Sequence, residues 1–547
     1  MPVFFFLYST IRMRLRRVGL WAAGITCAVA VCSKGVGQSG QVTNQRVSGL
    51  PHALAQIPLT SANTDAGTKP APPSSAGRYV AEPTVIERND REISFAADGT
   101  GSEHQTIVVR VQTDAAVKNL SIVSFTYASA SQRVDIEYIR VRHPDGSVVD
   151  TPIADALEMP TEIMRQAPFY SDLKQKQVPV RGLCAGDRLE WSVRLVRTAA
   201  EAPGRFWGVS AFTGREAVAL AETFTLRLPK SVSATVWSPK QPAKVTEEGA
   251  ERVYRWTSSQ FDPTGGPEAE ARTEAEKKRT LTPEEIADRT DGALPLIAWT
   301  NFPDWPSVGA WYRTLEASRV TPDEAIRAKA TELISGKTTD EAKIRALYDY
   351  TATQIRYIGV ALGQGRYQPH LASEVLTNQY GDCKDKATLL ASLLSAAGYS
   401  ADTVLIGAGI RFNEAVPSPA VFNHAITAIS LGSGDAQQTI WLDSTQEVAP
   451  YRALLFGLRD KQALRIPLQG SARLDRTPVN LPFDSFQKFQ ATGVLDATGV
   501  AKGKLSFTYR GDDEIVLRTA VRQVSPGQYD QLGRVHANEA LRRSGRS

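Results

Sequence analysis

Short stretches in which apolar and polar residues alternate dominate the chain between residues 81 and 262. Alternation with a period of two is typical of β-strands that bury one face. Between two of these stretches stand Asp145 and Gly146, a pair that favours a tight hairpin turn. The pattern predicts an antiparallel, β-sandwich-like domain over residues 81–262. Its strands are expected at residues 107–111, 120–127, 134–141, 189–196, 224–228 and 253–256.

Helical spacing of apolar residues replaces this alternation after about residue 305. The letters Thr-Pro-Asp-Glu at the start of residues 321–334 fit a capping box with proline at the first helical position, and Gly336 closes the helix they predict. A second helix is expected over residues 340–355. Helices followed by strands indicate an α+β core over residues 297–470. The strands of this core are expected at residues 403–406, 425–431 and 439–442.

Segments of other composition separate or follow these units. Residues 38–80 are rich in Pro, Ser, Thr, Ala and Gly and predict a flexible spacer, and the charged residues 263–296 predict a linker. Strand patterns broken by glycine predict a short C-terminal β region over residues 471–547, with a polar tail from residue 525 that we expect to be disordered. A length of 547 residues agrees with about three domains.

The start of the chain has the features of a secretory signal over residues 1–37. Arg14, Arg16 and Arg17 precede an apolar run that is shorter than the roughly 20 residues a membrane-spanning helix needs. Retention as an anchor and lipid attachment at Cys32 are the alternatives, and Met13 is an alternative start. We expect an exported protein that is periplasmic or associated with the cell envelope.

Charge and cysteine content narrow the possible functions. Five of the 63 basic residues and none of the 58 acidic ones lie in the first 37, so the remaining chain is neutral. A neutral chain without a basic block has no electrostatic footprint for nucleic acid. Only Cys184 and Cys383 remain after the signal, which excludes a disulfide scaffold. We expect Cys184 to be structural and partly buried.

Cys383 is the strongest candidate for chemistry because it stands where an amphipathic helix is predicted to begin. A helix N-terminus has free N–H groups and a partial positive charge, which favour a thiolate and can hold an oxyanion. Asp382 is expected to cap this helix or to support the oxyanion. Lys384 and Lys386 would either raise the local positive potential or face solvent.

His424 and Asp443 are the candidate partners of this thiol. His424 begins one predicted strand and Asp443 ends the next, so two adjacent antiparallel strands would place them side by side. Taken singly, each of the three residues is more often structural, but their joint occurrence favours a thiol site. The hypothesis would end if the sulfur were buried in packing or the ring pointed away from it. His370 shares the region but has no assigned role, and the glycine-rich residues 359–370 are interpreted as a substrate-side loop.

Three motifs resemble the core of bacterial transglutaminase-like proteins, members of the papain-like cysteine superfamily. They are GDCKDKATLL at 381–390, FNHA at 422–425 and LDST at 442–445. The β domain resembles the domain of unknown function that precedes this core in one large bacterial family. The resemblance implies a papain-like catalytic core in which Cys383 is the nucleophile, His424 the general base and then acid, and Asp443 the residue that orients the imidazole.

The sequence thus favours an exported thiol enzyme that acts on amide bonds of protein or peptide by acyl transfer or hydrolysis. A cysteine peptidase or amidase acting on envelope peptide is one alternative, and a non-catalytic binding or assembly module is another. No cofactor and no metal site are expected, because no clustered Cys/His or Asp-rich loop is present. The side-chain oxyanion donor and the oligomeric state stay open.

Overall fold

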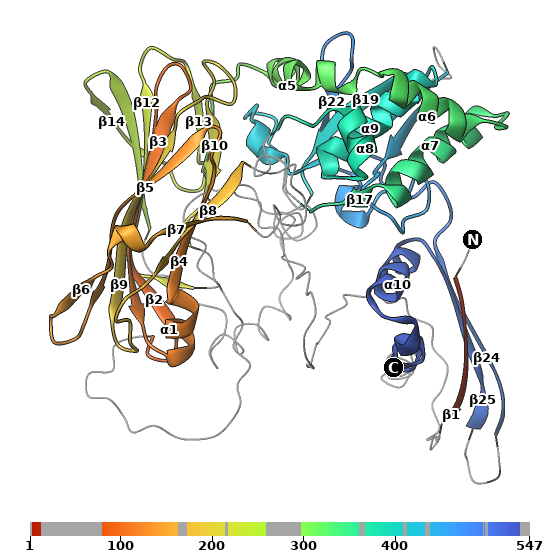
Figure 1. Ribbon diagram of the computed structural model, residues 1–547, viewed down its shortest axis with the longest axis horizontal. Helices are drawn as coiled ribbons and strands as arrows, with labels where there is room; N and C mark the ends of the chain where they lie inside the picture. The colour runs from red at the N-terminus through yellow and green to blue at the C-terminus, as the bar shows by residue number, and fades with distance from the viewer. Residues whose placement is uncertain are drawn as a thin grey trace.

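The computed structural model describes residues 3–11, 79–161, 172–213, 217–258, 297–359, 367–408, 413–432, 438–495, 497 and 501–535 (Figure 1). Three predicted segments lie outside this part of the chain. They are residues 12–37 of the predicted signal, nearly all of the predicted spacer, and the predicted linker. Within it, the protein consists of an N-terminal β-rich region, a central α+β core and C-terminal strands. No described helix combines the length and the apolar character required to cross a membrane.

A nine-stranded sheet forms the centre of the N-terminal region, with the order β14-β15-β12-β2-β3-β9-β5-β6 and β11 paired to β2. Most neighbours are antiparallel, but β2 pairs in parallel with β12 and β11, so the expectation of a purely antiparallel domain is wrong there. Alternation along one strand cannot reveal this pairing, because the partners are far apart in the sequence. The strands are β2 (Thr84–Phe95), β3 (Gly101–Val111), β5 (Gln132–Arg142), β6 (Val148–Asp150), β9 (Arg188–Arg197), β11 (Val218–Ala219), β12 (Glu222–Pro229), β14 (Lys244–Glu248) and β15 (Glu251–Ser258).

Two smaller sheets pack against this sheet. One contains β4 (Ile122–Ala128), β7 (Leu157–Pro160) and β8 (Leu173–Pro179), and its buried residues share a core with β3, β5, β9 and the short helix α1 (Asp114–Leu120). The other contains β10 (Trp207–Ser210), β13 (Thr235–Trp237) and β16 (Ile297–Thr300), and packs with β2, β12 and β15. The N-terminal region therefore has two apolar cores.

The central core has a five-stranded antiparallel sheet in the order β21-β20-β19-β22-β23. Helix α9 packs on this sheet and contacts α5, α6, α7 and α8. The strands are β19 (Ala401–Ile406), β20 (His424–Leu431), β21 (Gln438–Leu442), β22 (Gln462–Ile466) and β23 (Arg473–Arg476), and a short pair is formed by β17 (Arg356–Tyr357) and β18 (Tyr380–Gly381). The helices are α5 (Trp305–Val320), α6 (Glu324–Ile334), α7 (Asp340–Gln354), α8 (Ala372–Asn378) and α9 (Cys383–Ala396).

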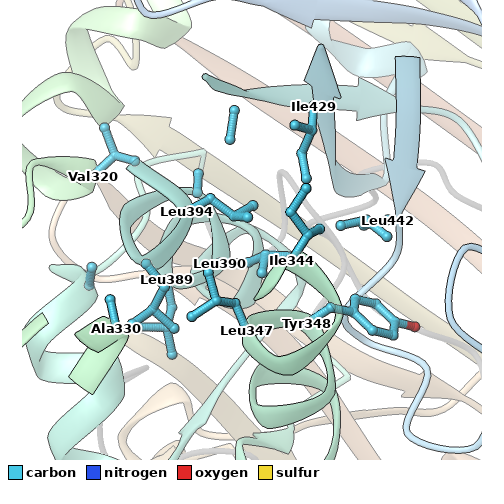
Figure 2. Packing of buried hydrophobic residues seen from close by; sticks show 14 of the residues in the cluster. Val320, Ala330, Ile344, Leu347, Tyr348, Leu389, Leu390, Leu394, Ile429 and Leu442 are labelled. Atoms are coloured by element: carbon cyan, nitrogen blue, oxygen red, sulfur yellow. The ribbon is translucent and has the colours of Figure 1, made fainter. Parts of the chain in front are cut away.

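Leucines of α9 form the centre of this core. Figure 2 shows Leu390 and Leu394 among Ile344 of α7, Ile429 of β20 and Leu442 of β21. All five are fully buried. Burial of one such side chain stabilises the fold by about 1.5–3 kcal/mol, so this packing fixes the position of α9 and of the residue that begins it.

The helix expected from residue 321 begins later than the capping pattern predicted. The N-cap of α6 is Asp323, whose side chain accepts a hydrogen bond from Ile326 N at 2.9 Å. Thr321 is instead the C-cap of α5, a helix that the sequence did not predict. The expected end of the core also moves, because β23 lies beyond residue 470 and pairs with β22.

The C-terminal strands β24 (Phe486–Leu495) and β25 (Ala501–Arg510) form a sheet with β1 (Val3–Ile11), which lies within the predicted signal (Figure 1). Helix α10 (Asp512–Gln523) and a 3₁₀ turn, η6 (Pro526–Gln528), follow, and residues 529–535 are helical. The tail expected to be disordered from residue 525 is therefore ordered up to 535, while residues 536–547 lie outside the described part of the chain.

Candidate active site

Cys383 is the first residue of α9, and a reciprocal capping box fixes this helix start. The side chain of Asp382 accepts from Asp385 N at 3.2 Å, and that of Asp385 accepts from Asp382 N at 3.3 Å. Gly381 allows this close turn, because a Cβ there would lie 2.6 Å from Asp385 Cβ. The thiol is thereby placed at the positive end of the helix dipole.

His424 and Asp443 lie together because their strands are neighbours. His424 begins β20, Asp443 follows β21, and the distance between His424 Nε2 and Asp443 Oδ2 is 3.2 Å. The other carboxylate oxygen, Oδ1, accepts from Thr445 N at 3.0 Å and from its hydroxyl at 2.7 Å. Asn423 anchors the start of β20 through two hydrogen bonds to the backbone of Ala408. The carboxylate and the ring are thus both held in place.

The side chain of Cys383 lies close enough to the imidazole of His424 to affect its pKa. Since Nε2 faces Asp443, Nδ1 is the ring nitrogen left for the sulfur. Burial alone would lower the pKa of His424, but the charge of Asp443, its hydrogen bond and the contact with Cys383 raise it to about 10. Burial alone would raise the pKa of Asp443, whereas His424 and Thr445 hold it below its usual value. The ring is therefore protonated near neutral pH.

The sulfur itself is not accessible in this conformation. Cys383 is 1% exposed and belongs to an apolar cluster with Trp305, Tyr367 and Phe422. Burial of the sulfur is one of the two outcomes that the sequence analysis set against the enzyme hypothesis, and it is met here. The other, a ring that points away from the sulfur, is not met, because the side chain of Cys383 still acts on the His424 imidazole. A cysteine that serves only to fill an apolar core gains nothing from a protonated imidazole beside it. Reaction would require part of this packing to open.

Lys384 and Lys386 are both fully buried, so the alternative in which they face solvent is wrong. The reason is that α9 is a central helix whose residues 383–394 are all buried. Lys384 forms an ion pair with Asp382. Burial and the charge of Asp385 raise the pKa of Asp382 to about 6, against the effect of Lys384.

Lys386 joins the cysteine helix to the end of α7. Its Nζ donates to Ala352 O at 3.2 Å and to Ile355 O at 2.5 Å, where carbonyls have no partner inside the helix. Burial lowers the pKa of Lys386 to about 8, and the charges of Asp443 and Glu447 oppose this effect. A second buried cation therefore acts on Asp443 besides His424.

His370 is tied to the start of α9 through Asp385. Its backbone N–H and its Nδ1 lie 2.9 and 3.1 Å from Asp385 Oδ1. Burial would lower the pKa of His370, but the hydrogen bond and charge of Asp385 raise it. Most of the predicted substrate-side loop, residues 360–366, lies outside the described residues.

Tyr357 is a further residue of the site that the sequence did not indicate. It lies on β17, in parallel register with Gly381 of β18, two residues before Cys383. Tyr357 is 40% exposed, and its partial burial, followed by the charges of Cys383, Asp382 and Asp443, raises the pKa of its hydroxyl. Its hydroxyl keeps its proton and can donate a hydrogen bond beside the thiol. An aromatic residue just after a predicted helix was the only signal available.

Cys184 lies in the β-rich region and takes no part in this arrangement. It is exposed, so the expectation of a partly buried cysteine is wrong. Its backbone N–H donates to Asp187 Oδ2 at 2.7 Å, and His143 contacts the other oxygen of Asp187. The turn is held by this carboxylate rather than by the thiol.

Two family models match separate parts of this chain. Residues 97–264 match the model of a domain of unknown function with solved structure, DUF3857, and residues 327–425 match that of the transglutaminase-like superfamily. Comparison with curated proteins gives no match.

Among solved structures, a candidate protease from Parabacteroides distasonis is similar with a TM-score of 0.57 and 12% identity, over 82% of this chain and 97% of that chain. At this identity the likeness concerns the fold alone. An M1 zinc metallopeptidase from Deinococcus radiodurans gives a TM-score of only 0.20 at 12% identity, over 32% of this chain and 38% of that chain, and bears no argument.

Proposed function

We propose that this chain, which joins a DUF3857 domain to a core of the transglutaminase-like superfamily, is a thiol enzyme that acts on amide bonds of protein or peptide. The observation that carries the proposal is the position of His424, which contacts Asp443 on one side and Cys383 on the other. In this role Cys383 is the nucleophile, His424 the acid and base, and Asp443 the residue that orients the ring.

The chemistry would proceed in two steps. Cys383 Sγ bonds to the carbonyl carbon of an amide, the C–N bond breaks, and His424 gives its proton to the leaving amine or ammonia, which leaves a thioester. Water or a second amine then bonds to the acyl carbon and loses its proton to His424, while the C–S bond breaks. The thiolate and the imidazolium are restored. In this proposal the helix N-terminus and the Tyr357 hydroxyl would stabilise the oxyanion.

Both outcomes of the second step use the same side chains. Hydrolysis of peptide bonds, as in a cysteine peptidase or amidase acting on envelope peptide, would correspond to the name of the candidate protease of similar fold, which is said of that protein. The match to the transglutaminase-like superfamily supports transfer to an amine. Incorporation of dansylcadaverine into casein would indicate transfer, and new peptide termini or released ammonia without incorporation would indicate hydrolysis.

We also propose that the enzyme acts outside the cytoplasm, in the periplasm or at the cell envelope. Arg14, Arg16, Arg17 and the apolar residues that follow support this location. Fractionation of cells that express the full chain, followed by N-terminal sequencing, would test it. Recovery of the uncut chain from the cytoplasm would contradict it.

The central test is the reactivity of the Cys383 thiol, measured in a Cys184→Ser background because Cys184 is exposed. An unpaired thiol alkylates on the order of 100-fold more slowly at about pH 6 than at about pH 8.5. We expect iodoacetamide to alkylate Cys383 at similar rates at the two pH values, and His424→Ala to restore the steep dependence. A steep dependence in the unaltered site, unchanged by His424→Ala, would favour the non-catalytic binding module.

A further inference from the structure

Strand β16 lies within the range predicted for the central core, but it belongs to a sheet of the N-terminal domain. Strand β16 lies between β10 and β13 and pairs with both in antiparallel register. All four of its residues are buried. Only four residues separate it from α5, the first helix of the core. The two units therefore share a strand and a very short connection.

Asn301, the residue after β16, fastens this connection. Its side chain accepts from Phe206 N at 2.7 Å and donates to Gly204 O at 2.8 Å, and its carbonyl accepts from the Arg205 side chain at 2.8 Å. Asn301 is 5% exposed. Hydrogen bonds in such a buried setting hold the loop before β10 against the start of the core.

Strand β10 also packs against the segment that leads to His424. Val209 of β10 and Ala298 of β16 form an apolar cluster with Val416, and β10 contacts the 3₁₀ turn η3 (Pro419–Val421). The hydroxyl of Thr300 donates to Pro417 O at 2.7 Å. The N-terminal domain thus contacts and positions residues 416–421, which lie three to eight positions before His424.

The same strand reaches the surroundings of the thiol through Trp207. Its ring lies 5.0 Å from that of Trp311 and 5.9 Å from that of Tyr367, measured between centroids. Trp311 Nε1 donates to Glu201 O of the N-terminal domain at 3.2 Å. These rings pack in the apolar cluster that contains Cys383. Trp207 and Val209 are two residues apart, so they point to the same side of the strand.

We propose that the N-terminal β domain is a working part of the active site, in which Trp207 and Val209 are positioning residues for the pair formed by Cys383 and His424. The inference rests on the proposed function. Strand β10 supports the segment before His424 through Val209 and the cluster around Cys383 through Trp207. Loosening either support lets the imidazole and the sulfur separate, and the thiol then behaves as an unpaired one.

The test uses the full chain with Cys184→Ser and compares Trp207→Ala and Val209→Ala with Val193→Ala. Val193 is a buried valine of β9 in the other apolar core of the domain, so it matches Val209 in side chain and burial. The measurement is the ratio of iodoacetamide alkylation rates of Cys383 at about pH 6 and about pH 8.5. A change in access to the thiol alters both rates alike, so the ratio reports the pairing alone.

We expect Trp207→Ala and Val209→Ala to lower this ratio at least about threefold, and Val193→Ala to leave it unchanged despite a similar loss of stability. Trp207→Phe keeps an aromatic ring and should retain the ratio. This variant is the control for the possibility that a low ratio in Trp207→Ala comes from misfolding. Equal ratios in the Val209→Ala and Val193→Ala proteins, with His424→Ala still lowering the ratio, would overturn this inference alone. A ratio that His424→Ala leaves unchanged would overturn the proposed function as well.

Discussion

His424 Nε2 lies 3.2 Å from Asp443 Oδ2 because the two strands that carry these residues pair in the register Thr427 to Leu442. That register brings the start of one strand beside the end of the other. The carboxylate is almost fully buried, so its charge acts on the ring with little screening by solvent. The ionisation of the site is therefore set mainly by this pair.

Asp443→Asn should return the His424 pKa toward its ordinary value and weaken the pairing with the thiol. The amide keeps the shape of the carboxylate but not its charge. We expect the ratio of Cys383 alkylation rates at about pH 6 and about pH 8.5 to fall about tenfold. Asp187→Asn is a matched control, because Asp187 also faces a histidine, His143, but in the β-rich region. An equal fall in both variants would contradict the prediction.

The stability of the core should decrease at alkaline pH because of His424. Its folded pKa, about 10, lies above the unfolded value of 6.5, so the stabilisation is complete below pH 6.5 and is lost as the pH rises toward 10. The loss should be on the order of 3–5 kcal/mol in the urea unfolding of the core. His424→Gln should remove this loss and leave the change of opposite sign from Lys386, whose folded pKa of about 8 lies below its ordinary value of 10.5. A loss of stability between pH 6.5 and 10 that persists in His424→Gln would assign it to another group.

Lys386→Met should destabilise the core by about 1–3 kcal/mol, because two buried carbonyls at the end of α7 lose their donor. The variant also removes a cation that acts on Asp443, so the alkylation ratio of Cys383 should change as well. Urea unfolding and alkylation together check both effects. Lys337→Met, at an exposed lysine, is the control and should change neither.

Glu316→Gln should stabilise the protein at about pH 8. Burial, and then the charge of Asp402, raise the pKa of Glu316 to about 7, although the hydroxyl of Thr403 opposes the shift. Because the fold prefers the protonated acid, stability falls as the pH rises from 4.5 to about 7. The gain from Glu316→Gln should reach up to about 3 kcal/mol at pH 8 and vanish near pH 4.5. Glu341→Gln, at an exposed position, should show no such difference.

Local patterns predicted the parts of the fold that depend on local spacing. The helix expected over 340–355 is α7, and Ile344, Leu347 and Tyr348 are buried as the spacing indicated. The strands that begin at His424 and end before Asp443 were also predicted, and so was the proximity of these two residues. In each case one buried face repeats with a helical or strand period.

Features that depend on distant segments could not be predicted in this way. The lysines of α9 are buried because other helices and the sheet surround it, which its own periodicity does not reveal. Helix α5 was missed although Trp305, Val308 and Tyr312 have helical spacing, because the buried Gly309 and Glu316 interrupt its apolar face. Strand β16 was assigned to the core by position in the sequence, although its partners lie in the N-terminal domain.

Because β16 is hydrogen-bonded on both edges to strands from the other side of the linker, severing the chain anywhere between residues 259 and 296 would not set the N-terminal fragment free. The two pieces would elute together in gel filtration and would separate only in denaturant. A nicked preparation would look cleaved on a denaturing gel and intact in solution.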